Sequence, residues 1–412
     1  MNYKERWGYI SLILPFIFFF PLFPNVFGAS QIHINLLVLA LIFIPFCLYF
    51  RIGDYKGLKQ LVIYYYFICQ LLLFPTLIVD IIYGEIGYGS VFSFLRPVFL
   101  CIVYLAIIEL VARASIERIM FVIKAIVLVS FLYAVVELFL LDLFSDFVFG
   151  LYKREDRVNL LFSSTTFFGT TYYSSFAFFT LALLILGNYE RTGKINNIFL
   201  FFLACSLVVL TQSKAGMLSL FIALCLMMCV SYFQWLRLGL LFILILFFAI
   251  LVNINYIFDL LSDFNLVSVK QIYELIYNTD ESETLGLRMQ QIIYSLDIVN
   301  NHLGFFGGGL VPQDGSLESW PALFLYRYGI LGVFNFIFFS LLISALSYRA
   351  LVRKFNVRFS AFAKSGFAWG ITLPLTQIST PMMELGKTAF IANFFLAFLT
   401  VSLREKIVER KH

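Results

Sequence analysis

Charged residues are scarce in this chain of 412 residues. They make up 13% of it, whereas a soluble globular domain carries about 25%. Hydrophobic residues make up 61% of the chain, and the mean hydropathy is +0.93. This composition excludes a soluble globular domain and predicts an integral membrane protein.

The sequence lacks the residue patterns required for several kinds of site, including nucleotide-binding loops, disulfides and metal sites. No GxxxxGK[ST] sequence occurs, which argues against nucleotide-driven chemistry. All six cysteines fall in apolar runs, so we predict no disulfide. Cys225 and Cys229 share a helix face, but no nearby His or Cys completes a metal site, so we predict neither metal nor cofactor. The net charge of +5 is spread over short loops and does not suggest nucleic-acid binding.

Long apolar runs alternate with short polar turns along most of the chain. Because a helix needs about 20 apolar residues to cross a bilayer, we predict an all-α fold with about 12 transmembrane helices. The first run has the length of a signal peptide, but its prolines and the helices after it favour a retained span. The twelve predicted spans are 8–24, 32–50, 61–83, 91–111, 119–141, 167–187, 195–211, 216–234, 236–257, 321–346, 361–380 and 388–403.

The distribution of basic residues predicts the orientation of the chain. With the N-terminus inside the cell, twenty of the 29 Lys and Arg residues fall on the cytoplasmic side and nine on the other. Since loops rich in Lys and Arg stay in the cytoplasm, we expect both termini to be cytoplasmic.

One long hydrophilic segment, residues 258–320, separates the ninth and tenth predicted spans. Loops longer than about 12–15 residues are uncommon in compact architectures and are usually functional. We therefore divide the chain into spans 1–9 (residues 1–257), an extracytoplasmic loop (258–320), and spans 10–12 with a cytoplasmic tail (321–412).

The long loop carries internal patterns. Apolar residues at helical spacing predict amphipathic helices over 269–276 and 285–299, which would lie on the bilayer or cap the bundle. The sequence GFFGGG at 304–309 follows. Such a run lets the backbone approach a ligand closely, or serves as a flexible connector.

Nine basic residues fall on the outer side. Charged groups at membrane depth are costly and seldom face lipid, so cations retained here suggest a bound anion. Arg suits phosphate because its planar fork donates two hydrogen bonds at once. The alternative is that each cation pairs with a nearby acid, as Lys387 could with Glu384 or Arg96 with Glu137. The nine residues are Arg96, Lys153, Arg154, Arg157, Lys214, Lys270, Arg288, Arg327 and Lys387.

Two carboxylates, Asp314 and Glu318, precede the tenth predicted span in the sequence DGSLESWP. Cations beside a carboxylate suit glycosyl transfer from a lipid diphosphate. The cations stabilise the leaving group, and the carboxylate deprotonates the acceptor hydroxyl. Glu318 is the first candidate base, Asp314 the second and His302 the third. Alternatively, Glu318 is an interfacial acid that pairs with Arg327.

Four segments carry further patterns, in this order: RVNLLFSSTTFFGTTYYS, LTQSKAG, GLRMQQIIYSLDIVNNHLGFFGGG and ESWPALFLYRYGILG. Their order and position within about 160–330 resemble the Wzy-type O-antigen and capsule polymerases, relatives of the O-antigen ligases. The resemblance places Arg157, Lys214, Arg288 and Glu318 at characteristic positions. Lys214 stands where the family often has Arg, which keeps the charge but loses the bidentate geometry. Glu318 stands where the ligases have His, which favours a polymerase.

The resemblance implies a GT-C-like glycosyltransferase in the bacterial cytoplasmic (inner) membrane. It would transfer a growing glycan from undecaprenyl diphosphate to the next lipid-linked repeat unit, without a metal. Glu318 and Asp314 would be the catalytic residues. The partners would be the lipid-linked donor and acceptor and membrane lipid; whether a chain-length regulator binds stays open. The residues expected to bind the diphosphate are Arg157, Lys214, Arg288, Arg327 and Arg96.

Two other functions compete with this interpretation. A flippase or other transporter of lipid-linked glycans also has about twelve spans. Such transporters, however, connect their spans by short turns and place charge near the bilayer midplane. The long loop and the outward position of Arg96, Lys214 and Arg288 therefore favour an enzyme. An O-antigen-type ligase is the second alternative.

Overall fold

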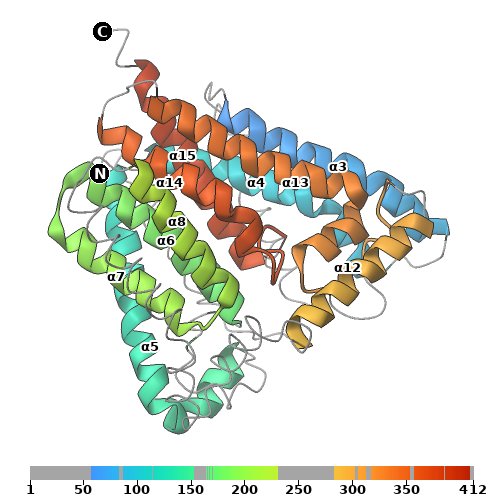
Figure 1. Ribbon diagram of the computed structural model, residues 1–412, viewed down its shortest axis with the longest axis horizontal. Helices are drawn as coiled ribbons and strands as arrows, with labels where there is room; N and C mark the ends of the chain where they lie inside the picture. The colour runs from blue at the N-terminus through green and yellow to red at the C-terminus, as the bar shows by residue number, and fades with distance from the viewer. Residues whose placement is uncertain are drawn as a thin grey trace, which may run out of the picture.

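In the described part of this computed structural model, every element of regular secondary structure is an α-helix (Figure 1). This confirms the predicted all-α class for that part of the chain. The described residues are 57–82, 87–113, 115–152, 164, 166, 168, 170–230, 283–301, 305–311, 317–352, 357–384 and 386–408.

Nine helices of the described ranges coincide with predicted spans. Five of them contain segments long and apolar enough to cross a membrane, namely Leu58–Ile82, Gly89–Glu109, Ile116–Leu138, Thr171–Thr192 and Trp320–Val352. The predicted spans 8–24, 32–50 and 236–257 and the predicted helix 269–276 lie outside the described residues. The helices are α3 (Leu58–Ile82), α4 (Tyr88–Arg113), α5 (Ile116–Tyr152), α6 (Thr171–Thr192), α7 (Ile195–Leu210), α8 (Lys214–Val230), α12 (Glu283–Asn301), α13 (Trp320–Val352), α14 (Val357–Thr376) and α15 (Gly386–Val408).

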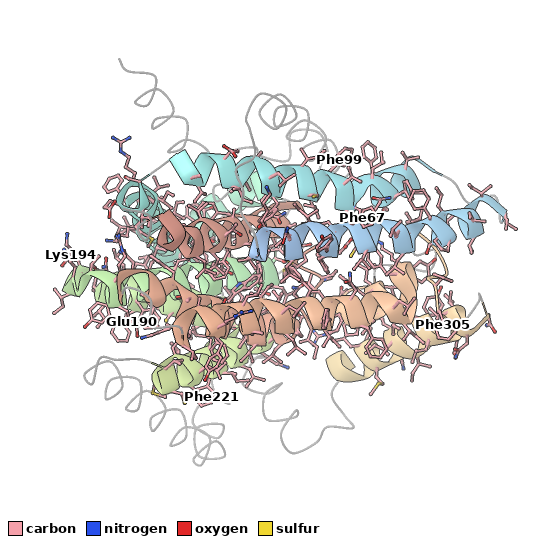
Figure 2. The ribbon with its side chains drawn as sticks, turned by 90° about the horizontal axis from the view of Figure 1, so that it is seen from above. Phe67, Phe99, Glu190, Lys194, Phe221 and Phe305 are labelled. Atoms are coloured by element: carbon pink, nitrogen blue, oxygen red, sulfur yellow. The ribbon has the colours of Figure 1, made fainter. Side chains whose placement is uncertain are left out.

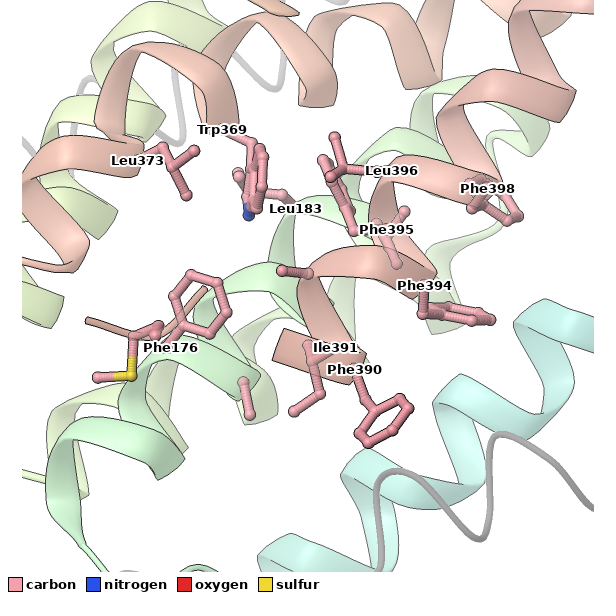
Figure 3. Close-up of a cluster of buried hydrophobic side chains, with 14 of the residues drawn as sticks. Phe176, Leu183, Trp369, Leu373, Phe390, Ile391, Phe394, Phe395, Leu396 and Phe398 are labelled. Atoms are coloured by element: carbon pink, nitrogen blue, oxygen red, sulfur yellow. The ribbon is translucent and has the colours of Figure 1, made fainter. Parts of the chain in front are cut away.

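Helix α6 lies at the centre of the described bundle. It packs against α5, α7, α8, α14 and α15, and nearly all of its side chains are buried. Large rings fill the space around it. The ring centroids of Trp369 and Phe395 are 4.8 Å apart, and the Trp369 indole N–H donates to Thr180 Oγ1 of α6 at 3.1 Å. Figure 3 shows these rings beside Phe176 and Leu183 of α6. The bundle therefore holds α6 in a fixed position.

Two helices differ from the spans predicted for them. Helix α5 continues to Tyr152, so the predicted end of its span at 141 is wrong. Residues from Asp142 onward, which we expected to start a loop, continue the helix. Helix α13 is broken at Gly329, where φ is 67° and ψ is −167°. This backbone conformation favours glycine. A Cβ at Gly329 would also lie 2.1 Å from the Phe305 carbonyl oxygen, so the break and the glycine-rich segment depend on each other.

Helix α12 confirms the amphipathic helix predicted over 285–299. It packs on α13 and runs across the direction of α3 in Figure 1. Phe305, which follows α12, lies at the opposite end of the molecule from Glu190 and Lys194 (Figure 2). We call the end with Phe305 the outer end and the end with Glu190 the inner end.

Candidate functional site

The first turn of α6 contacts the long loop through Arg288. The Arg288 guanidinium lies over the Tyr172 ring, 6.0 Å from the ring centroid. Its Nη2 also donates to the Tyr172 hydroxyl at 3.4 Å. Both contacts restrict a flexible side chain that is half-buried. Arg288 is therefore held, with its charge available, beside the start of α6.

Glu318, near the end of the long loop, lies beside the same part of α6. Gln291, one turn along α12 from Arg288, accepts hydrogen bonds from the backbone N–H groups of Glu318 at 3.2 Å and Ser319 at 3.4 Å. Glu318 is exposed, and its charge acts on the Tyr173 hydroxyl. Arg288 and Glu318 thus both lie beside the first turn of α6, joined through α12 by Gln291. We call Tyr172, Tyr173, Arg288, Gln291 and Glu318 the outer cluster.

Lys214 approaches α6 from a third direction. It is the first residue of α8, and the first turns of α8 and α6 are in direct contact. A Cβ at Gly216 would lie only 1.7 Å from the Ser175 Oγ, so only glycine permits this approach. The N-termini of α6 and α8 therefore lie close together. A helix N-terminus carries partial positive charge, which favours an anion. Some of the N–H groups here are already capped, since the Tyr173 N–H donates to Thr170 Oγ1 and the Gly216 N–H donates to Ser213 Oγ.

Two buried hydroxyls accompany this arrangement. Ser175 and Ser319 are each 1% exposed, and among the described residues their Oγ atoms have no hydrogen-bond partner. Buried polar groups are nearly always bonded in folded proteins. Two hydroxyls without partners among the described residues therefore lie in the segments that carry the outer cluster.

Glu137 fixes the residues that lead into α6. Its Oε2 accepts from the Ser164 hydroxyl at 2.5 Å and from the Thr166 backbone N–H at 3.0 Å. The Ser164 N–H donates in turn to the Leu210 carbonyl at 2.9 Å. Glu137 therefore ties this segment to α5 and to the end of α7. The predicted pairing of Glu137 with Arg96 stays a prediction.

Arg96 and Arg327 meet away from the outer cluster, on a carboxylate inside the bundle. Arg327 Nη1 lies 3.1 Å from Glu384 Oε2, and Arg96 Nη1 lies 3.6 Å from the same atom. The Tyr328 hydroxyl donates to Glu384 Oε1 at 2.6 Å. All four residues are buried. The alternative pairing of Arg327 with Glu318 is therefore replaced by a pairing with Glu384, while the predicted contact of both arginines with a diphosphate stays a prediction.

The sequence did not identify Glu384 as a member of a cluster. It suggested Glu384 only as a partner for Lys387, whose side chain lies outside the described set. The available signal was an acid in a short segment between two apolar runs, because charged groups at membrane depth are paired and rarely incidental.

Three predicted residues of the site lie outside the described residues: Arg157, Asp314 and His302. Within the described part of the chain, no group of three or more His, Cys, Asp or Glu side chains could hold a metal ion.

Residues 199–337 match the family described as O-antigen ligase. The matched segment contains Lys214, Arg288, Glu318 and Arg327. This similarity supports a relation to the O-antigen ligase and polymerase superfamily and does not separate polymerases from ligases. The chain has no match among curated proteins.

Proposed function

We propose that the protein is a membrane glycosyltransferase of the O-antigen polymerase type. It transfers a growing glycan from undecaprenyl diphosphate to the next lipid-linked repeat unit. One observation carries the proposal. Arg288, near the middle of the polar segment 258–320, and Glu318, near its end, both lie beside the first turn of α6, and both fall within the stretch similar to O-antigen ligases.

The donor diphosphate binds at the adjoining N-termini of α6 and α8. Arg288 and Lys214 supply side-chain charge there, and the two helix N-termini add partial positive charge. Tyr172 orients the Arg288 fork, which suits two phosphate oxygens at once. Arg157 is a third candidate ligand, because it precedes the segment that Glu137 ties to α6.

Glu318 acts as the general base, with Asp314 as the second candidate. The carboxylate takes the proton from the acceptor hydroxyl while the acceptor oxygen bonds to the anomeric carbon of the donor. The bond from that carbon to the diphosphate oxygen breaks, and undecaprenyl diphosphate leaves with the electron pair. The basic residues stabilise the charge that develops on it. Side-chain cations thus take the part that a metal ion plays in many other transferases.

The outer cluster faces the extracytoplasmic side of the bacterial inner membrane in this proposal, and both termini are cytoplasmic. The excess of Lys and Arg in the loops at the opposite end supports this orientation. The complete chain then has about 12 spans and a GT-C-like arrangement, with the long loop above the outer ends of the helices.

An O-antigen-type ligase is a second candidate, because the matching family carries that description. The two functions differ in the acceptor. A polymerase uses another lipid-linked repeat unit, and a ligase uses a lipid-anchored core. Glu318 at the position where the ligases have His favours the polymerase.

The test uses the full chain in lipid nanodiscs with purified undecaprenyl-diphosphate-linked repeat units. We expect a ladder of glycan lengths from the wild type. Glu318→Ala should abolish the ladder, and Arg288→Ala should raise the donor concentration needed for half-maximal rate. Asp297→Ala is the matched control, because Asp297 is an exposed acid on α12 outside the outer cluster.

Three results would contradict the proposal. A wild-type protein that only moves the donor across the bilayer would be a flippase. Transfer to a lipid-anchored core without a ladder would identify a ligase. A normal ladder from Glu318→Ala would remove Glu318 as the base.

A further inference from the structure

Three pieces of irregular backbone meet around Glu384. They are the glycine-rich segment 305–311, the break in α13 at Gly329, and the turn 377–384 between α14 and α15. Glu384 is 5% exposed. Irregular backbone at membrane depth is tolerated only where protein groups satisfy its N–H and C=O groups. The contacts around Glu384 show how this requirement is met.

The glycine-rich segment is bound to the start of α13 by backbone contacts. The Gly308 N–H donates to the Tyr326 carbonyl at 2.8 Å. A Cβ at Gly307 would lie 2.2 Å from the Arg327 carbonyl oxygen. The backbones of the two segments are therefore in contact, with no room for a side chain between them. The Leu310 N–H donates to Asp80 of α3, 3.2 Å from Oδ2. The segment is thus held between α13 and α3.

Arg327 connects this segment to Glu384. Its Nε donates to the Leu310 carbonyl at 3.0 Å, and its Nη1 donates to Glu384 Oε2 at 3.1 Å. One guanidinium therefore binds the segment with one edge and the carboxylate with another. Arg96 and the Tyr328 hydroxyl occupy further positions around the same carboxylate.

The network contains two cations and two carboxylates, since Arg96 and Arg327 both contact Glu384 and Asp80 accepts the Leu310 N–H. The two guanidinium groups also repel each other, because both lie on the same Glu384 oxygen. Without the Glu384 charge, two buried cations would remain close together with a large desolvation penalty. The carboxylate is therefore what allows Arg327 to stay in place against Leu310.

The held segment lies in sequence between the two principal residues of the outer cluster. Helix α12 with Arg288 precedes segment 305–311, and Glu318 follows it just before α13 begins. Release of the segment would remove one of the connections that set α12 relative to the start of α13, and misplacement by about 1 Å can cost about 100-fold in rate.

We propose that Glu384 is a positioning residue for the transfer reaction. Through Arg327 it fixes segment 305–311 against α13, and so fixes Arg288 relative to Glu318. The inference rests on the proposed function, and it assigns Glu384 no contact with the substrate.

The test measures backbone hydrogen exchange and turnover on the same purified protein in nanodiscs. In Glu384→Gln we expect exchange in segment 305–311 to rise about tenfold or more, because the segment opens more often once Arg327 no longer holds the Leu310 carbonyl in place. Exchange in the middle of α6 should stay unchanged. The turnover number should fall about 100-fold, with a much smaller change in the half-saturating donor concentration.

Two further variants keep the result interpretable. Tyr328→Phe removes one hydrogen bond and keeps both ion pairs, so it should fold and show a smaller rise in exchange, about threefold. Glu190→Gln removes a buried carboxylate at the inner end and should leave exchange in 305–311 unchanged.

Two results would overturn the inference. In the first, the Glu384→Gln variant loses activity without faster exchange in 305–311. In the second, exchange rises while turnover is retained. A wild-type protein without transferase activity would instead contradict the proposed function, and the exchange data would still show whether Glu384 holds the segment.

Discussion

Buried carboxylates hold cations at both ends of the helix bundle, but they do so differently. At the inner end, Glu190 of α6 pairs with Lys364 of α14, with Oε2 and Nζ 2.7 Å apart and both side chains 2% exposed. This is one acid, one base and two continuous helices. At the other end, Glu384 serves two arginines and a tyrosine where the backbone is irregular.

The difference separates two uses of buried charge. The inner pair joins helices whose backbone groups are already satisfied, so it contributes to how α6 and α14 pack. The Glu384 network instead stabilises segment 305–311, whose backbone lies outside the helices and lacks their regular hydrogen bonds. Changes at the inner end should therefore affect stability, and changes at the network should affect the geometry of the outer cluster.

The largest effect on stability should come from removing half of the inner pair. Lys364→Met leaves Glu190 buried without its cation, which should destabilise the protein by about 3–5 kcal/mol. The double variant Lys364→Met/Glu190→Gln should recover much of this loss. Thermal unfolding in nanodiscs measures both. The activity per folded molecule should be unchanged, and a large loss of that activity would break the distinction between the two ends.

A smaller effect on stability, with a larger one on activity, is expected from Gly329→Ala. The new Cβ would meet the Phe305 carbonyl oxygen at 2.1 Å, and φ of 67° disfavours alanine. Strain of this kind costs about 1–3 kcal/mol. Gly286→Ala is the matched control, because nothing lies within 4 Å of its Cβ position. Equal turnover in the two variants would show that the break in α13 does not matter for the site.

Asp80→Asn should have a more local effect. The Asp80 carboxylate accepts the Leu310 N–H, and the substitution removes its charge. Loss of a charged acceptor lowers the free energy of unfolding by about 1–3 kcal/mol. Faster exchange should be confined to segment 305–311. Exchange that also rises in α6 or α14 would mean that the network supports the whole bundle and is not specific to the outer end.

The smallest effect should come from Glu117→Gln at the inner end. Arg191 donates to Glu117 at 2.9 Å, but the Glu117 side chain is 71% exposed. Exposed ion pairs contribute about 0–1 kcal/mol. We expect almost no change in unfolding temperature or activity. A loss of stability comparable to that of Lys364→Met would show that the exposure of an ion pair does not indicate how much it stabilises this protein.

Hydropathy and periodicity predicted much of the fold. The apolar runs located nine of the described helices, five of which are long and apolar enough to cross a membrane, and the helical spacing of Met289, Ile292 and Leu296 predicted α12. The extension of α5 was missed because Asp142 and Asp146 interrupt its hydropathy, although the helix continues through them.

The site was predictable only in part. The resemblance selected Arg288 and Glu318, and the structure brings both to the first turn of α6. The convergence of Arg96, Arg327 and Glu384 could not be predicted from local pattern. These residues belong to segments far apart in the chain, and only the packing of α4 and α13 around the 377–384 turn brings them together.

The central claim is that Arg288 and Glu318 act together on a lipid-linked donor. The most direct measurement is the rate of glycan transfer by Glu318→Gln, Arg288→Gln and the double variant, in nanodiscs with purified lipid-linked repeat units. Loss of a general base costs about 100-fold to 10,000-fold. We expect a loss in that range for Glu318→Gln, and a double variant much less impaired than the product of the two single losses. Glycan ladders formed at the wild-type rate by Glu318→Gln would contradict the account.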